Sequence, residues 1–474
     1  MKKMLLMVCS GYFFSLMTCA QQSKIEAITS LDEKTIAFPG AEGFGKYTTG
    51  GRGGKVFIVT NLNDDGEGSF RKAATAQEHR IIVFAVSGTI HLNSPLRIAG
   101  NVTIAGQTAP GDGICLADEP VHISGDNMVV RFIRFRMGDK YQKGGMVDGN
   151  GSDDAFGGTR RNNIIIDHCS MSWSTDEVFS IYAGDSTTLQ WNIISEPLNY
   201  SYHFETGDKD YEHHGFGAIW GGLHLTAHHN LFAHCNNRCP RFNGIRHTAT
   251  ESVDYRNNVI YNWGSNNIYA GEGGNYNIVN NYFKYGPNTN KTVLSRICNP
   301  GKNETIGFGK WYVNGNYVDE AKDVTDNNWL GVYMGNGGTE KDTKECLQDN
   351  AFPAEDIAIQ SAKEAYMAVL QFAGCSLPVR DTLDMRIMQN VVERKGNLID
   401  VQGGFPHGTE YEKTVSAWPK LRSLPPVFDH DRDGMDDDWE VKHGLNPYDS
   451  IDANKLTLNK SYTNIEIYIN SLVK

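Results

Sequence analysis

One pattern recurs in three stretches and decides the fold: 225–232 (LTAHHNLF), 255–261 (YRNNVIY) and 278–284 (IVNNYFK). In each stretch a short strand-like run ends at an asparagine that apolar residues follow. Asparagine tolerates the left-handed backbone angles of a turn, so stacked coils would place these amides above one another as a ladder. We therefore assign the recurring asparagines to the fold rather than to catalysis: Asn192, Asn230, Asn258, Asn281 and Asn316.

The same part of the chain contains a repeat of short β-type runs, from about residue 80 to residue 320. The runs recur roughly every 24–36 residues, a period typical of solenoids. Long helical periodicity is absent, so the sequence predicts an all-β coil. The predicted strands are 81–86, 102–104, 128–135, 163–167, 187–194, 223–226, 253–255 and 276–279.

The composition agrees with a turn-rich β protein that has a large core. The chain has 474 residues, of which 40% are hydrophobic and 50 are glycine. Its net charge of −12 means that a polyanionic partner would need a locally basic cleft or a bridging cation. We expect a monomer and no nucleic-acid partner.

The N-terminus has the features of an export signal. Two lysines precede the largely apolar run 4–17, which is too short to span a membrane comfortably. The residues TCA that end at Ala20 suit cleavage there, which predicts a signal peptide over residues 1–20 and a secreted protein. The residues LMTC also form an imperfect lipobox, so the alternative of an outer-membrane lipoprotein anchored at Cys19 stays open. Contact with a membrane is expected only for that alternative.

The pattern of the chain changes after about residue 350, and we predict a β-coil domain over residues 35–345. Residues 346–423 are expected to form a packed extension with helices within 353–374 and 380–395. A proline-containing linker then opens a small module over 424–474. One face of the first helix is expected to be apolar through Ala362, Ala365, Val369 and Phe372.

Residues 429–440 match the calcium loop D-x-D-x-D-G-x5-E at every ligand position. Gly434 would make the sharp turn, Met435 would offer its carbonyl oxygen, and Glu440 would bind through both carboxylate oxygens. Asp452 belongs only to a fragment of a second loop. We expect the module to be structural, with a solvated acidic loop as the alternative. The predicted ligands are Asp429, Asp431, Asp433, Asp437 and Glu440.

Two arginines flank a proline in the stretch 237–242 (NRCPRF), which follows a strand-like run. The proline restricts the shape of the turn. Arg238 and Arg241 in the groove of a β-coil would suit a sugar that bears a carboxylate, because the guanidinium fork pairs with carboxylates. A surface turn with satisfied arginines is the alternative.

Acidic residues occur in three successive coils, at 152–154 (SDD), 167–168 (DH) and 176–177 (DE). On a solenoid such positions come together on one face. Clustered carboxylates repel one another unless a cation binds or a proton is shared, and calcium suits ligands that are all oxygen. Asp154 and the pair at 176–177 are therefore candidate calcium ligands, with solvated turn acids as the alternative.

Histidines and cysteines give weaker signals. His228 and His229 are adjacent and would point to opposite faces of a strand, which makes a histidine metal site a minor alternative. Seven cysteines follow the signal peptide at wide spacings, so they form no disulfide framework and are interpreted as buried or incidental thiols. A disulfide between Cys346 and Cys375 stays open.

Together the motifs resemble polysaccharide lyase family one, the pectate lyases, over most of the mature chain. The resemblance implies a right-handed single-stranded parallel β-helix of the pectin lyase-like kind, with calcium as cofactor and polygalacturonate as the polysaccharide partner. None of the motifs is specific alone. They are 37–45 (AFPGAEGFG), 50–54 (GGRGG), 66–71 (GEGSFR), 166–168 (IDH), 237–242 (NRCPRF) and 376–381 (SLPVRD).

The family's calcium ligands map onto this chain with departures. One ligand of a pair lies thirteen residues before the aspartate of I-D-H, which gives Asp154. Its companion position, two residues earlier, holds Ser152 rather than an acid, and Asp153 lies between the two. The next acidic ligand aligns with Asp176, and Glu177 is adjacent. The partner four residues on is Ser180, so the resemblance implies a weaker or rearranged site.

The resemblance also implies roles for basic residues. The family's catalytic arginine, which opens the R-x-P motif, corresponds to Arg238. A further arginine five residues on falls at Asn243, so Arg241 is expected to bind substrate instead. The substrate-binding lysine has no clear counterpart, and Lys209 and His214 are the candidates.

The implied reaction is β-elimination. A base removes the C5 proton of a galacturonate, calcium on the neighbouring carboxylate stabilises the developing charge, and the C4 oxygen leaves, which gives a 4,5-unsaturated product. Arginine is an unusual base because guanidinium normally stays protonated. The alternatives are a non-catalytic β-helix that binds polysaccharide and a polygalacturonase-type hydrolase, whose N-T-D and R-I-K motifs are absent.

Overall fold

The structure is a computed structural model that describes residues 34–143, 153–335 and 338–473. The predicted signal peptide, its Cys19 and Ser152 lie outside the described residues. Ile36–Lys474 form one compact unit. Within the described ranges, helices are all too short or too polar to cross a membrane.

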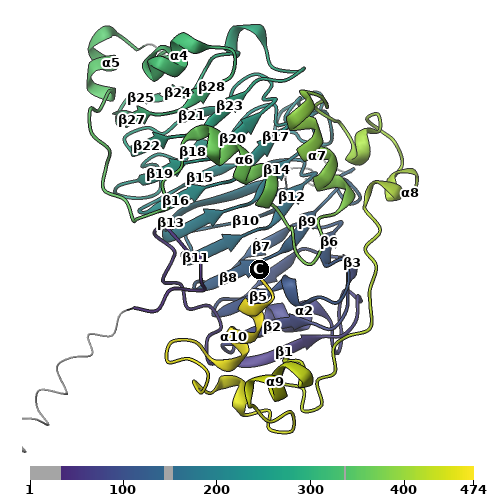
Figure 1. The fold of residues 1–474 in the computed structure, drawn as a ribbon. Helices are drawn as coiled ribbons and strands as arrows, with labels where there is room; N and C mark the ends of the chain where they lie inside the picture. The colour runs from purple at the N-terminus through teal and green to yellow at the C-terminus, as the bar shows by residue number, and fades with distance from the viewer. Residues whose placement is uncertain (1–33, 144–152, 336–337, 474) are drawn as a thin grey trace, which may run out of the picture. The chain divides into compact units, whose positions relative to one another are not determined.

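Parallel strands wind into a coil that has three faces, so the predicted all-β parallel β-helix is confirmed (Figure 1). One turn of the coil places one strand on each face in succession. The first face consists of β1 (Lys55–Val59), β2 (Arg80–Phe84), β5 (Val102–Ala105), β8 (Met128–Arg131), β11 (Asn162–Asp167), the second half of β13 (Phe179–Gln190), β16 (Leu225–His228), β19 (Ser252–Arg256), β22 (Asn275–Val279) and β27 (Lys310–Asn314).

The second face is a separate nine-stranded sheet. It consists of β3 (Gly88–His91), β6 (Ile114–Ala117), β9 (Ile133–Arg136), β12 (Ser170–Ser172), β14 (Ile193–Ser195), β17 (Leu231–Ala233), β20 (Val259–Tyr261), β23 (Tyr282–Lys284) and β28 (Tyr317–Val318).

The third face joins the first through β13, whose two halves pair with strands of both faces. It consists of β4 (Leu96–Ile98), β7 (Val121–Ile123), β10 (Phe156–Thr159), the first half of β13, β15 (Ile219–Gly222), β18 (Arg241–Phe242), β21 (Ile268–Ala270) and β24 (Cys298–Pro300). A short antiparallel pair, β25 (Lys302–Asn303) and β26 (Gly307–Phe308), stands apart from the coil sheets.

Two of the predicted strands are in fact two elements each. The run 128–135 is divided into β8 and β9 at Phe132, whose φ of 56° is left-handed. The run 187–194 contains the end of β13 and the start of β14, with a left-handed Trp191 at the corner (φ 58°). Apolar content continues through these corners, so hydrophobicity alone did not reveal them.

The asparagine ladder is present. The side-chain amide of Asn192 donates to Oδ1 of Asn230 (2.9 Å), and that of Asn230 donates to Oδ1 of Asn258 (2.9 Å). The ladder continues through Asn281 and Asn316, with amide contacts of 3.1 and 2.9 Å. An additional rung, Asn328, accepts from the Asn316 amide at 3.0 Å. Each amide therefore satisfies its neighbour inside the protein, where an unpaired polar group would be costly.

The left-handed residue at each rung is the one before the ladder asparagine, contrary to our expectation. His229, Asn257 and Asn280 have φ values of 55°, 56° and 54°, and their ladder neighbours are not among the residues with positive φ. The residue before the rung bends the chain from the first face to the second. The ladder asparagine is thereby free to point its amide into the stack.

Strand side chains alternate between the interior and the outside of the coil. In β2, Ile82 and Phe84 belong to the main core, whereas Ile81 and Val83 belong to a separate apolar cluster outside. Aromatic rings stack within the coil, as in the row of Phe242, Tyr276 and Trp311, whose neighbouring centroids are 4.7 and 4.4 Å apart. The core therefore follows the axis of the coil.

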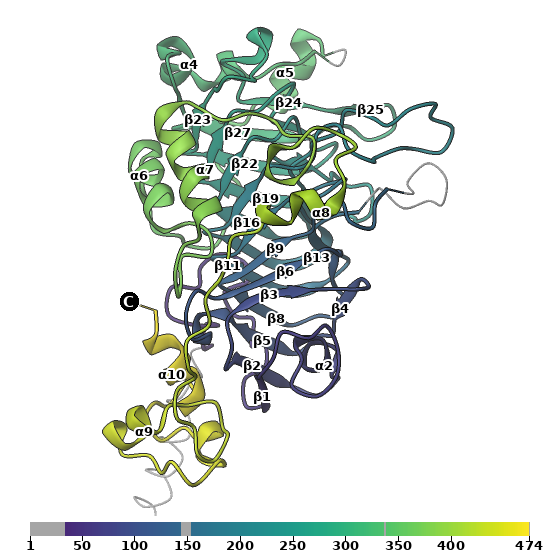
Figure 2. The same ribbon diagram turned by 90° about the vertical axis from the view of Figure 1, so that its right-hand side faces the viewer.

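Two helices, α6 (Ala362–Phe372) and α7 (Thr382–Glu393), cover the outer side of the second face (Figures 1 and 2). Ser361 and Glu364 form a capping box that starts α6, whereas the predicted helix began at residue 353. Ala362, Ala365 and Val369 are buried as expected, but Phe372 is 47% exposed. The last predicted member of the apolar face is thus only partly covered, although its ring still packs edge-on against Trp191 of the coil (centroids 6.1 Å apart).

The remaining helices lie at the ends and edges of the coil. The described residues contain α2 (Phe70–Thr75), α4 (Lys322–Asp326), α5 (Glu340–Cys346), α8 (Tyr411–Thr414), α9 (Asp437–His443) and α10 (Asn464–Ser471). Helices α4 and α5 lie near the β27–β28 end, and α9 and α10 lie near β1 and β2 (Figure 1).

The described cysteines all have free thiols in buried positions, so Cys346 and Cys375 do not form the disulfide that sequence left open. His228 and His229 also differ from expectation. Their rings do not point to opposite faces, because left-handed His229 turns back and the two Nδ1 atoms are 2.8 Å apart. They contact each other, Gln190 and Gln360, and Glu42 lies 3.8 Å from Nε2 of His228. Neither histidine belongs to a group of converging metal-binding side chains in the part of the chain that the structure describes.

We predict that Asn230→Ala destabilises the protein strongly. The change leaves the buried amides of Asn192 without their acceptor and removes the donor to the Leu189 carbonyl (2.8 Å). Each unsatisfied buried group costs about 1–3 kcal/mol, so the total should reach at least about 2 kcal/mol. The melting temperature should fall by several degrees, whereas exposed Asn314→Ala should change it little. Equal melting temperatures for the two variants would contradict a structural role for the ladder.

Candidate active site

The candidate site lies at the corner where the chain passes from the second face to the third. Glu177 pairs through its backbone with Phe216, and Phe216 pairs with Asn237, so these residues occupy equivalent positions in successive coils. One coil earlier, Asp154 accepts a hydrogen bond from the Glu177 backbone N–H at 3.1 Å. The stacking of coils thus brings residues that are 21 to 83 positions apart into one row.

Asp154, Asp176 and Glu177 form one acidic cluster. Each can present a carboxylate oxygen within 4.8 Å of the others. Although part of Asp154 remains accessible, burial and then the negative charge of Asp176 raise its pKa well above the ordinary value. Such mutual repulsion is the expected cost of crowding carboxylates where no cation separates them.

Asp167, which sequence grouped with these acids, does not join the cluster. It ends β11 on the first face and forms a 2.7 Å ion pair with Arg131, and a 2.7 Å contact with the ring of His168. It is fully buried, yet the charges of His168 and Arg131 overcome burial and lower its pKa. Asp167 is therefore part of the framework and not of the candidate site.

Arg238 lies directly beside the acidic cluster. Its guanidinium forms an ion pair with the Glu177 carboxylate, and its Nε donates to the Tyr269 hydroxyl at 3.2 Å. It also lies over the Phe216 ring, 4.4 Å from the centroid. The side chain is 21% exposed, so it is positioned from several sides but still reaches the surface.

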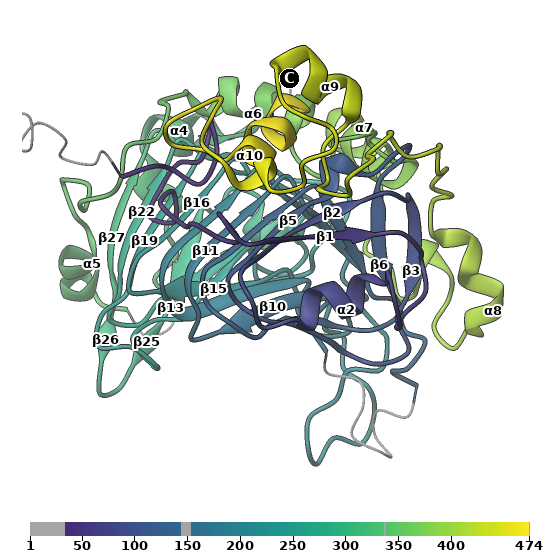
Figure 3. The ribbon, with the colours of Figure 1, turned by 90° about the horizontal axis from the view of Figure 1, so that it is seen from below.

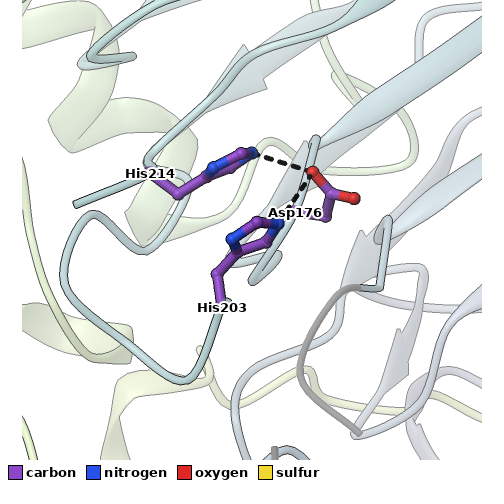
Figure 4. Close-up of side chains that lie close together, drawn as sticks. All are labelled: Asp176, His203 and His214. Carbon is purple, nitrogen blue, oxygen red and sulfur yellow. Dashed lines mark hydrogen bonds and ion pairs between the residues drawn. The ribbon is translucent and has the colours of Figure 1, made fainter. Parts of the chain in front are cut away.

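Two histidines contact the acidic cluster from the loop before β15 (Figure 4). Nε2 of His214 lies 2.8 Å from Oδ1 of Asp176, and Nε2 of His203 lies 3.6 Å from the same oxygen. The two rings stack with centroids 3.7 Å apart. Burial alone would raise the pKa of Asp176, but the hydrogen bond and charge of His214 outweigh it and hold that pKa below its ordinary value.

His203 has a second acidic neighbour, since its Nδ1 lies 3.1 Å from the Glu212 carboxylate. Burial and then the charge of His214 lower the pKa of His203. The arrangement of His203, His214 and Asp176 also satisfies the geometry of a metal site, because single ligand atoms of the three lie within 4.8 Å. The sequence suggested a histidine metal site only as a minor alternative, and it suggested His214 only as a substrate-binding residue. His203 and His214 are eleven residues apart in the sequence, and their rings meet because the loop folds back.

The other predicted substrate-binding residues lie further from the acids. Arg241 in β18 is 8% exposed, donates to the Phe242 carbonyl and lies 4.0 Å from Glu272. Burial and then Arg246 lower the pKa of Arg241. Lys209 is exposed on the loop and forms no ion pair with any part of the chain that the structure describes.

The outer side of the third face forms a polar groove next to the cluster. Strand register aligns Arg97 with His122 and His122 with Gly157, and Gly157 with Ser180. A hollow of about 290 Å³ opens there and reaches Asp154. Its wall also contains Arg161 and Tyr182, neither of which had a signal in the sequence. Register between strands, rather than any local motif, assembles this surface.

Comparison with known proteins places this architecture among pectate lyases. The chain is 37% identical over 460 residues to a probable pectate lyase C of Neosartorya fischeri, an alignment that covers 94% of this chain and 95% of the relative. It is 37% identical to a probable pectate lyase C of Aspergillus terreus over 92% of this chain and 94% of the relative. Pectate lyase 5 of Ambrosia artemisiifolia is 26% identical over 61% of this chain and 68% of the relative.

Solved structures give a more distant likeness. A pectate lyase bound to a hexasaccharide has a TM-score of 0.48 and 15% identity, and covers 73% of this chain and 99% of its own. The major cedar pollen allergen has a TM-score of 0.47 and 19% identity, and covers 70% of this chain and 92% of its own. No family model matches the chain.

The fold and the acidic cluster beside an arginine define a parallel β-helix protein with a candidate cation-dependent site. On the identity and coverage of its curated relatives, the chain belongs to the pectate lyase family.

Proposed function

We propose that this chain is a secreted, calcium-dependent pectate lyase that cleaves α-1,4-linked polygalacturonate by β-elimination and releases 4,5-unsaturated oligogalacturonides. The observation that carries the proposal is the contact of Arg238 with the cluster of Asp154, Asp176 and Glu177, in a chain that shares 37% identity with curated pectate lyases. The polar groove beside the cluster supports a polysaccharide substrate.

The donor set suits calcium. Asp154, Asp176 and Glu177 offer carboxylate oxygens that converge, and calcium prefers such oxygen ligands. Calcium bound here would neutralise the uronate carboxylate and stabilise the negative charge that develops when the adjacent proton leaves. Glu177 also pairs with Arg238, so its carboxylate has two competing partners.

The chain's own residues would position the substrate and move the proton. Arg238 is assigned the proton-abstracting role, because it reaches the surface at the cluster and is oriented by Tyr269 and Phe216. Guanidinium normally keeps its proton, so we expect activity to increase toward alkaline pH. Arg241 would bind a substrate carboxylate through its guanidinium fork.

His214 is assigned a positioning role. Its side chain is only 6% exposed and its Nε2 contacts Oδ1 of Asp176 at 2.8 Å, so it orients a proposed calcium ligand from behind. Groups that hold a metal ligand in this way affect metal affinity strongly. Lys209 remains a candidate for substrate contact through its exposed place on the same loop.

A polygalacturonase-type hydrolase is less well supported, because the N-T-D and R-I-K motifs are absent from the sequence and the curated relatives are pectate lyases. A non-catalytic polysaccharide-binding protein is the other alternative. Only elimination creates the unsaturated product, so ultraviolet absorbance on polygalacturonate separates the lyase from both.

We predict that activity requires calcium and depends on Asp154. Asp154→Asn keeps the shape of the side chain but removes one of the three negative charges that would hold the ion. The calcium concentration for half-maximal activity should rise at least about tenfold, by analogy with the loss of one metal-supporting group. The measurement is the initial rate of absorbance increase across a calcium titration after chelation.

Asp185→Asn is the matched control, since Asp185 lies on β13 and, within the described residues, its carboxylate bonds only to the His224 ring and the Ser186 backbone N–H. It should leave the calcium dependence unchanged. Full activity of the parent after exhaustive chelation would contradict the calcium requirement.

We predict that Arg238→Lys lowers turnover about 10²–10⁴-fold, the range of a positioned proton transfer. Lysine keeps the charge but lacks the planar fork that contacts both Glu177 and Tyr269. Arg241→Lys should instead raise KM more than it lowers kcat, because it affects substrate binding. Initial rates against polygalacturonate concentration distinguish the two patterns once both variants are shown to be folded.

An Arg238→Lys enzyme within a few-fold of the parent turnover would exclude Arg238 as the base. The remaining candidates for the base would then be His203 and His214, which contact Asp176 of the same cluster.

A further inference from the structure

The C-terminal module covers apolar side chains on the outer side of the first coil (Figure 3). Ile81 and Val83 of β2 pack there with Met435 of the predicted calcium loop and with α10. Every residue of β2 is buried, which requires a cover on both sides of the strand. Without the module, these outward side chains would face water at the β1–β2 end of the coil.

Polar contacts join the same surfaces. Arg52 forms a 2.8 Å ion pair with Glu466 of α10, and the Asn454 amide donates to the Gly54 carbonyl at 3.1 Å. Arg131 of β8 donates to the Asn470 side chain at 3.2 Å. The module is therefore attached to the coil at two places, just before β1 and at the end of β8.

The calcium-like loop provides part of this attachment directly. Gly434 has a φ of 92°, and a Cβ there would lie 2.9 Å from Val56 and 3.1 Å from Val83. The next residue, Met435, is fully buried in the shared cluster. The turn at Gly434 is thus pressed against β1 and β2, and the conformation of the loop determines whether Met435 reaches the cluster.

The loop surrounds buried carboxylate oxygens that have no hydrogen-bond partner among the described residues. Glu440 is 0% exposed, and neither of its carboxylate oxygens has a hydrogen-bond partner in the described part of the chain. Asp433 is 2% exposed and Asp452 is 5% exposed, and each has one unpartnered buried oxygen. Buried carboxylates are almost always paired or bound to a cation, so this arrangement indicates a missing positive partner.

These carboxylates converge. Asp433, Glu440 and Asp452 can place one oxygen each within 4.8 Å of one another, and Asp433 also belongs to a group of the same tightness with Asp429 and Asp431. Across the residues that the structure covers, none of the five forms a salt bridge. Burial and then neighbouring acids raise the pKa of Glu440 to about 8, which reflects the uncompensated charge.

Asp452 was not expected in this group. It lies twelve residues beyond Glu440, outside the twelve-residue loop, and follows α9 by a turn that folds back. Asp437 was predicted as a ligand, but its Oδ1 accepts the His430 backbone N–H at 2.8 Å. Asp452 offers an unpartnered buried oxygen to the cluster, whereas Asp437 belongs to neither of the two groups of converging carboxylates that the described part of the module contains.

We propose that Asp429, Asp431, Asp433, Glu440 and Asp452 bind one structural calcium ion, which clamps the C-terminal module onto β1 and β2. The ion would link the loop to the segment after α9, and so hold Met435 on one side and Asn454 on the other against the first coil. It is separate from the cluster at Asp154, with which it shares no residue. A calcium ion that binds only the folded form stabilises it by RT ln(1 + c/Kd), where c is the free calcium concentration, so the stabilisation increases with that concentration.

The test is the melting temperature of the full chain across a calcium titration, for the parent, Glu440→Gln and Asp452→Asn. Calcium at 100 times its dissociation constant multiplies the folded-to-unfolded ratio about 100-fold. The parent should therefore gain several degrees on calcium addition, and both variants should need at least about tenfold more calcium for the same gain. Asp438→Asn, an exposed acid of the same segment, is the control with the same charge change and should behave like the parent.

The Asp154→Asn variant keeps this test independent of the proposed catalytic site. Its calcium-dependent gain in melting temperature should persist, and the turnover of Glu440→Gln at saturating calcium should match the parent. A gain that is abolished by Asp154→Asn and retained in Asp452→Asn would overturn the proposal, whatever becomes of the proposed lyase activity.

Hydrogen exchange on the unmodified protein tests the clamp without any substitution. Removal of calcium by chelation should increase amide exchange in β1 and β2 together with the loop 429–440. Unchanged protection of β1 and β2, with exchange increased only in the loop, would show that the ion orders the loop but does not clamp the module.

Discussion

The stacking of each coil on the next in one fixed register is the constraint on which the rest of this molecule depends. The buried amide ladder enforces it, because each asparagine donates to the next rung and also to a strand carbonyl, as Asn230 does to Asn258 and Leu189. A shift by one residue would leave several of these groups unpaired in the interior. Since the ladder holds the coils in register, equivalent positions at the other corners align as well, and the row that contains Glu177 and Phe216 is one result.

The two acidic clusters differ in how the protein compensates the repulsion between their carboxylates. At the corner of the third face, Arg238 forms an ion pair with Glu177 and His214 contacts Asp176 through Nε2, so the protein itself supplies partners to part of this cluster. In the C-terminal module, Glu440 and Asp452 keep buried oxygens without any such partner. This difference agrees with the two roles proposed above, an exchangeable calcium ion at Asp154 and a structural one at Glu440.

Much of the fold was readable from the chain because its signals are local. A short apolar run followed by asparagine identified the coils, and the ladder prediction held for all five residues named. The errors concern corners, as at Phe132 and Trp191, where apolar residues adopt left-handed angles that asparagine was expected to take. At these corners the large ring stacks on a histidine, Phe132 on His168 and Trp191 on His229, and this packing offsets the backbone strain. Hydrophobicity alone does not show where that happens.

The sequence by itself determined the repeat, the R-x-P-R turn and the calcium-type loop, because each is a pattern of neighbours whose spacing defines the geometry. Only the tertiary structure decided which distant acids meet. It excludes Asp167 from the site through its pairing with Arg131, brings His203 to Asp176, and adds Asp452 to the loop at Glu440. Coil register and chain reversal bring these residues together. Local spacing in the sequence does not specify which coils stack on one another or where a loop folds back, so it could not predict these contacts.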